Sequence, residues 1–130
     1  MEEPMTGGPR LKLTATVLDS PDANRLAAFY RRLLGWAVRA EEPGWVALAD
    51  PGGGAGLSFQ TEPLYGPPVW PAGAGDPQMM SHLDIEVDDL EAGVRHALAA
   101  GAELAPFQPQ DDVRVMLDPD GHPFCLWIPS

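Results

Sequence analysis

The stretch "SHLDIEVDDLEAGVRHALAAG", residues 81–101, decides the fold of this chain. Apolar and polar side chains alternate over residues 82–87, which predicts a strand with one buried face. The other face of that strand carries three groups that can bind ions or protons: His82, Asp84 and Glu86. The stretch therefore raises a question about chemistry as well as about fold.

A helix follows this strand, and the same plan occurs earlier in the chain. Asp88 or Asp89 is suited to cap the helix, and Gly101 is suited to end it. In the first half, residues 11–19 predict a strand, Ser20 or Asp22 is suited to cap the helix that follows, and Gly35 is suited to end it. The strand–helix unit is therefore present twice.

Each strand–helix unit is followed by further strands, and the helix-ending glycine and the Asp-Pro turn sequence of one half recur in the other half. The spacing between them is about 67 residues, which indicates an internal duplication. A Gly- and Pro-rich segment separates the halves. Further strands are predicted over residues 45–49, 57–61, 113–118 and 124–128.

Composition limits the classes of function. The 130 residues form one domain, and 45% of them are apolar. Eight basic and 19 acidic residues give a net charge of -11, which argues against nucleic acid and anionic membranes as partners. Cys125 is the single cysteine, the N-terminus lacks the pattern of a signal peptide, and no segment is long and apolar enough to span a membrane. We therefore expect a cytoplasmic protein.

Three segments together resemble a known superfamily. They are "VLDSPDANRLAAFYRRLLGW" (17–36), "SHLDIEVDDLEAGVRHALAAGA" (81–102) and "LDPDGHPFCLW" (117–127). In this order and spacing they resemble the vicinal oxygen chelate superfamily, which includes glyoxalase I, bleomycin resistance proteins and extradiol dioxygenases. The chain looks most like the small glyoxalase-like domain members.

The resemblance implies an α+β fold in which two βαβββ modules form a cupped mixed sheet with the helices outside. The expected domain organisation is an N-terminal tail over residues 1–10 and a single glyoxalase-like domain over 11–130. Within that domain we expect module one at about 11–62, a linker at about 63–79 and module two at about 80–130.

The resemblance also implies where a metal ion would bind. Metal-dependent relatives place one ligand on the first strand and one on the last strand of each module. The matching positions here are Ala15, Phe59 or Gln60, His82 and Cys125. Alanine has no donor atom, so the predicted cavity holds no metal and no other cofactor. If a divalent metal ion is present, its expected ligands are His82, Cys125 and Gln60.

The favoured function is therefore binding of a small organic ligand in a metal-free cavity, as in bleomycin-resistance-like sequestration. Carboxylates and aromatic rings in such a cavity favour a cationic, planar ligand. The alternatives are a metal-dependent lyase, isomerase or dioxygenase, and a metal-free enzyme with His82 as general base. No catalytic residue is assigned. The predicted ligand contacts are His82, Gln60, Cys125, Trp127 and Asp84.

The remaining candidate residues are given structural roles. His96 is expected on the helix surface, and His122 in the turn that follows Asp118. The run from Asp118 to Gly121 is interpreted as a turn, not as a carboxylate pair for acid–base chemistry. Exposed sheet edges predict a homodimer, as in relatives of this kind.

Overall fold

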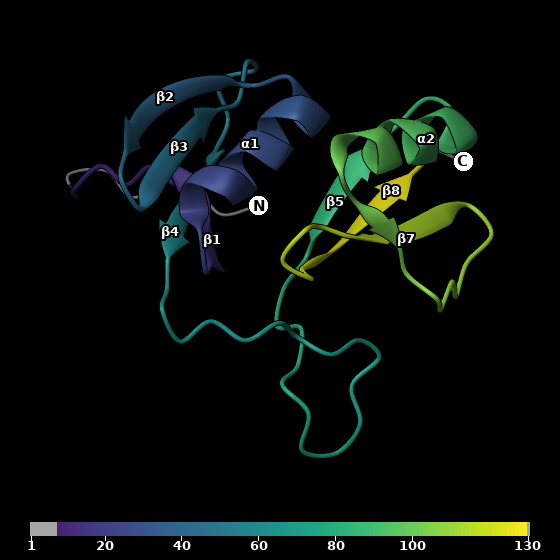
Figure 1. The fold of residues 1–130 in the computed structure, drawn as a ribbon. Helices are drawn as coiled ribbons and strands as arrows, with labels where there is room; N and C mark the ends of the chain where they lie inside the picture. The colour runs from purple at the N-terminus through teal and green to yellow at the C-terminus, as the bar shows by residue number, and fades with distance from the viewer. Residues whose placement is uncertain (1–7, 130) are drawn as a thin grey trace.

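The computed structural model describes residues 8–129 and contains two modules of one helix and four strands each (Figure 1). The predicted α+β fold of two βαβββ modules is confirmed. The first module consists of β1 (Ala15–Ser20), α1 (Ala23–Leu34), β2 (Ala37–Glu42), β3 (Trp45–Ala49) and β4 (Gly56–Thr61). The second consists of β5 (Leu83–Glu86), α2 (Leu90–Ala100), β6 (Glu103–Leu104), β7 (Val113–Leu117) and β8 (Pro123–Trp127).

Both sheets have the same topology, as an internal duplication requires. The strand orders are β1-β4-β3-β2 and β5-β8-β7-β6, and in each the first and last strands of the module pair in parallel. Among the described residues the two sheets are not hydrogen-bonded to each other, so they do not close into one sheet. The segment between β4 and β5 runs along one side of both modules (Figure 1).

Local sequence signals set the ends of α1. The side chain of Asp22 accepts a hydrogen bond from the backbone N–H of Arg25 at 3.2 Å, so Asp22 is the N-cap. Gly35 ends the helix with φ 72°, a left-handed conformation that glycine adopts at little cost. Ser20, the other predicted cap, instead donates its hydroxyl to Asp120 in the second module at 2.6 Å.

The first strand is shorter than predicted. It begins at Ala15, not at residue 11, because its partner strand β4 begins opposite at Gly56. Leu11 and Leu13 therefore lie outside the sheet, with exposed fractions of 91% and 76%. Of the predicted N-terminal tail, residues 1–7 fall outside the described part of the chain.

The core joins the two modules through α1. The ring of Tyr30 stacks on Phe59 of β4 at a centroid distance of 5.4 Å, and the ring of Phe29 meets Phe124 of β8 at 6.1 Å. All four side chains are fully buried. One face of each sheet is thus covered by this core, and the alternate side chains of each strand lie on the opposite, more open face.

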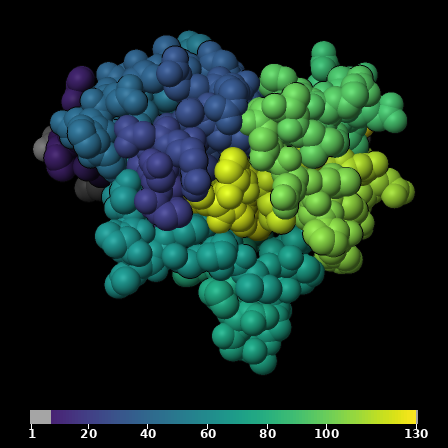
Figure 2. Space-filling model, in the orientation of Figure 1, coloured from purple at the N-terminus to yellow at the C-terminus, as the bar shows by residue number. Residues whose placement is uncertain are grey.

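The space-filling view shows how the parts meet. The β7–β8 turn and the start of β8, in yellow, lie at the centre of the face, between the purple first module and the teal linker (Figure 2). Neither helix within residues 8–129 is long and apolar enough to cross a membrane.

Candidate functional site

A pocket of about 400 Å³ lies on the open face of the second sheet. It brings together four of the five predicted ligand contacts: His82, Asp84, Cys125 and Trp127. The complete lining is His82, Asp84, Gln110, Asp112, Val113, Cys125, Trp127 and Ile128.

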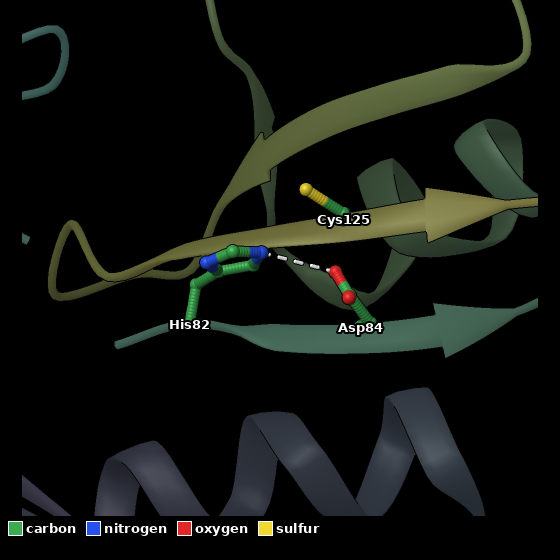
Figure 3. Close-up of side chains that lie close together, drawn as sticks. All are labelled: His82, Asp84 and Cys125. Carbon is green, nitrogen blue, oxygen red and sulfur yellow. Dashed lines mark ion pairs between the residues drawn. The ribbon is translucent and has the colours of Figure 1, made fainter. Parts of the chain in front are cut away.

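Three side chains of this lining lie close together: one just before β5, one on β5 and one on the adjacent β8 (Figure 3). His82 precedes β5 and Asp84 lies two residues further on, so both point to the same face, and Nε2 of His82 is 3.0 Å from Oδ1 of Asp84. Cys125 of β8 lies opposite Asp84 in the parallel register. One donor atom from each of the three residues lies within 4.8 Å of the others.

The His82–Asp84 pair is exposed to solvent, and the thiol of Cys125 is not activated. The His82 and Asp84 side chains are 36% and 63% exposed. Burial raises the pKa of the Cys125 thiol, and the charge of the nearby Asp84 carboxylate and hydrogen bonding to it raise this pKa further. Cys125 is therefore a neutral thiol at neutral pH, because a reactive thiolate needs a positive neighbour.

Charge and an aromatic ring define the rest of the pocket. Trp127 lies opposite Glu86 in the register, and Asp112 contributes a second carboxylate beside that of Asp84. The lining residues, all within the described range, include neither lysine nor arginine. The pocket thus combines negative charge with a large aromatic surface, which is an environment suited to cations.

Gln60, the fifth predicted contact, lies on the other sheet. Its side-chain amide donates a hydrogen bond to Asp19 at 2.8 Å on the open face of the first module, whereas Phe59 is buried in the core. The residue that matches Cys125 is Ser58, because it lies in the same register position of its own sheet. The prediction overlooked Ser58, although the 67-residue offset that relates Ala15 to His82 also leads to it.

These positions do not fit the ligand set that metal-dependent relatives share between their modules. The first module offers Ala15, which has no donor, and the buried hydroxyl of Ser58. The second module offers His82 and Cys125, with Asp84 as a third donor beside them. A set divided between the two modules is therefore not formed.

The turn after β7 holds a second His–Asp pair. The sequence predicted the turn itself but not the contact between these two side chains. Nδ1 of His122 is 2.8 Å from Oδ2 of Asp118, and Asp118 also accepts the hydroxyl of Tyr30 at 2.7 Å. His122 lines a different cavity, of about 430 Å³, between the modules and the linker. It does not join His82 in the pocket on the second sheet.

His96 and Trp70 make packing contacts away from this pocket. His96 is exposed on α2, as predicted, and its Nε2 lies 2.9 Å from the carbonyl of Leu33. Trp70 of the linker packs against Phe107 with a ring-centroid distance of 5.5 Å. Neither residue lines the pocket that contains His82.

Comparisons with known proteins place this geometry in context. The family model "Glyoxalase-like domain" matches residues 15–127. A glyoxalase/bleomycin resistance protein/dioxygenase family enzyme from Burkholderia phytofirmans has a similar structure, with 22% identity, a TM-score of 0.65 and coverage of 91% of this chain and 98% of that chain. A glyoxalase family protein from Enterococcus faecalis matches with 20% identity, a TM-score of 0.66 and coverage of 89% and 96%.

A glyoxalase-related enzyme from Fulvimarina pelagi matches with 19% identity and a TM-score of 0.65, and covers 91% of this chain and 88% of that chain. No curated protein matches the sequence. At these identities the solved structures establish the fold, and the site must be interpreted from its own residues.

Proposed function

The chain belongs to the glyoxalase-like domain family, and on that basis we propose that it is a small-molecule-binding member whose cavity works without a metal ion. The observation that carries the proposal is the pocket on the second sheet, in which Asp84, Asp112 and Trp127 gather around a volume of about 400 Å³. Such a volume is in the range of sites for small organic ligands.

The chemistry of the lining favours a cationic ligand with a planar ring. The indole of Trp127 offers a face for stacking and for a cation, and the carboxylates of Asp84 and Asp112 offer acceptors for N–H groups. His82 already contacts Asp84, so a ligand cation would compete with the imidazole for that carboxylate. The overall charge of -11 draws cations towards the protein from a distance.

Binding without turnover is the function that this site supports best. The thiol of Cys125 is held in its neutral form, and the donor set between the modules lacks a ligand at Ala15. We therefore propose sequestration of an organic compound, in the manner that the name bleomycin resistance protein implies for members of this superfamily. His82 and Cys125 then act as ligand contacts, with no bond made or broken.

We further propose that the protein is a cytoplasmic homodimer. β1 and β5 are edge strands of their sheets, and apolar side chains near them are solvent-exposed, among them Val17 and Met80. An unpaired edge beside exposed apolar groups is a surface that a second copy can cover. Light scattering is expected to give twice the chain mass, and a monomer at high micromolar concentration contradicts this part of the proposal.

A thermal-shift series tests the ligand class. Planar aromatic cations are compared with neutral and anionic aromatic compounds of the same size, with chelator present, since specific binding to the folded state raises Tm. The proposal expects a rise for the cations alone. Asp84→Asn and Trp127→Leu are expected to reduce it, whereas Glu91→Gln on α2, which removes the same charge elsewhere, leaves it unchanged. Equal shifts for all three ligand classes contradict the proposal.

One observation favours a second function, which is metal-dependent lyase, isomerase or dioxygenase activity. His82, Asp84 and Cys125 place three donor atoms within 4.8 Å of one another on one module. Catalytic metal sites often have three protein ligands. Titration with Co²⁺ separates the two functions, because a thiolate ligand gives an intense near-ultraviolet charge-transfer band. Metal-free binding expects no such band, and a band that Cys125→Ser abolishes favours the metal site.

A further inference from the structure

The turn between β7 and β8 fastens the two modules to each other. Asp118 is fully buried, and its Oδ1 accepts the backbone N–H groups of Asp120 and His122 at 2.9 and 3.0 Å. Its Oδ2 accepts the hydroxyl of Tyr30 in α1. A turn of the second module is thus anchored to the helix of the first by a buried charged hydrogen bond.

Asp120 makes three further contacts from the same turn. Its carboxylate accepts the hydroxyl of Ser20 at 2.6 Å and the guanidinium of Arg25 at 2.9 Å, both in the first module. Its backbone carbonyl accepts the hydroxyl of Tyr65 in the linker at 2.7 Å. The yellow segment at the centre of Figure 2 therefore meets the first module and the linker at once.

His122 occupies the middle of this network. Its side chain is 15% exposed, and Nδ1 lies 2.8 and 3.0 Å from the two oxygens of Asp118. Burial by itself lowers the pKa of His122, but the hydrogen bond to Asp118, the charges of Asp118 and Asp120, and hydrogen bonding to the backbone of Asp19 outweigh burial and raise it.

The charge on the ring explains why protonation matters. A neutral imidazole can donate a hydrogen bond to Asp118, but only an imidazolium also offsets the charge of this fully buried carboxylate. The same carboxylate accepts the hydroxyl of Tyr30 in α1. Protonation of His122 therefore stabilises the acceptor that joins the turn of the second module to the first module.

We propose that His122 is a pH-sensitive latch between the two modules, closed when the imidazole is protonated and loosened when it is neutral. In the closed form the imidazolium pairs with the buried carboxylate of Asp118, which also accepts the hydroxyl of Tyr30 from the first module. Loss of the proton leaves this carboxylate without its cationic partner. The turn that carries His122 is then less stable, and with it one side of the cavity between the modules and the linker.

The other groups around His122 do not provide this switch. Burial, followed by the negative charge of Asp118, raises the pKa of both Tyr30 and Tyr65, so these tyrosines keep their protons near neutral pH. The guanidinium of Arg25, on α1, contacts the carboxylate of Asp120. The carboxylates that act on the ring are those of Asp118 and Asp120, and Asp19 and Glu62 line the same cavity as His122. Histidine is the side chain that changes charge near neutral pH.

The direction of the pH effect follows from linkage. A histidine whose pKa is higher in the folded state contributes stability that is complete below the unfolded value of about 6.5 and is lost as pH rises through the folded value. The ratio of folded to unfolded protein is expected to fall about tenfold for each unit by which the folded pKa exceeds the unfolded one.

Urea denaturation between about pH 6 and about pH 9 measures this loss. The wild type is expected to lose stability over this range relative to His122→Gln, which can hydrogen-bond but does not titrate. His96→Gln, the same change at an exposed helix position, is expected to keep the wild-type slope. Equal slopes for the wild type and His122→Gln overturn the proposal.

Proton NMR of the wild type gives an independent result should His122→Gln fail to fold. The chain has three histidines, so the ring signals of His82 and His96 are assigned by single substitution and the third belongs to His122. The latch requires a pKa of His122 above about 6.5, and a pKa at or below that value overturns it.

Discussion

Two His–Asp pairs in this molecule have nearly the same geometry and opposite environments. His122–Asp118 spans 2.8 Å with side chains 15% and 0% exposed, whereas His82–Asp84 spans 3.0 Å with side chains 36% and 63% exposed. The hydrogen-bond partners of the first pair lie inside the protein. The second pair leaves carboxylate oxygens of Asp84 exposed to the pocket on the second sheet.

The difference between the pairs shows that burial, not residue type, determines their role. Asp118 must keep its donors, since a buried carboxylate that loses them carries an uncompensated charge. Asp84 can exchange its partner for a ligand or water at small cost, because exposed ion pairs contribute little stability. One pair is therefore suited to hold the fold, and the other to bind.

The largest expected effect is on the buried pair. Asp118→Ala leaves the hydroxyl of Tyr30 and two backbone N–H groups without their acceptor, and we expect a loss of about 3 kcal/mol in the free energy of unfolding. Urea denaturation measures it, with Asp84→Ala as the matched control. Equal losses for the two variants would show that the pairs do not differ.

Tyr30→Phe removes a single hydroxyl from the same network. The ring and its packing on Phe59 remain, but Asp118 loses one charge-assisted hydrogen bond, which corresponds to about 2 kcal/mol. Denaturation at neutral pH checks the value. In the Asp118→Ala background the same substitution should cost much less, because the acceptor is already absent.

His82→Gln is expected to change the free energy of unfolding by less than about 0.5 kcal/mol, because the contact with Asp84 is exposed. The same variant should alter the Tm shift produced by a cationic ligand, since His82 lines the pocket. A large loss of stability without any change in ligand response would reverse the roles assigned to the two pairs.

The smallest expected effect concerns the thiol of Cys125. Burial and Asp84 raise its pKa, so Asp84→Asn should lower that pKa towards its ordinary value while burial keeps part of the shift. The pH dependence of iodoacetamide labelling measures it. An unchanged profile would mean that the Asp84 carboxylate does not act on Cys125.

Much of the fold follows from local signals in the sequence. The alternation in residues 82–87, the caps at Asp22 and Asp89, and the glycines that end both helices led to the correct elements. β2 and β6 were not identified, because β2 is mostly exposed and Val38 is its one large apolar side chain, and β6 has two residues. Short, exposed strands depend on their neighbours for pairing and leave little pattern.

The site was predictable to the extent that it lies on one module. His82 and Asp84 follow from strand alternation, and Cys125 and Trp127 follow from the hairpin opposite them. Gln60 was placed with them because the resemblance assigns ligands to both modules, whereas the two sheets of the chain remain separate.

The network in the β7–β8 turn could not be predicted from local patterns. Its contacts join residues far apart in the chain: Ser20 to Asp120, 100 residues away, and Tyr30 to Asp118, 88 residues away. The run "DPDG" is typical of a turn wherever it occurs. Only the packing of α1 against the second module turns its two carboxylates into buried acceptors.

The central claim is that the pocket around His82 binds its ligand without a metal ion. Elemental analysis of protein purified without chelator and then dialysed against Zn²⁺ tests it most directly. The account predicts a substoichiometric metal content that is the same in the wild type and in His82→Ala. One equivalent of metal per chain in the wild type, lost in His82→Ala, would contradict it.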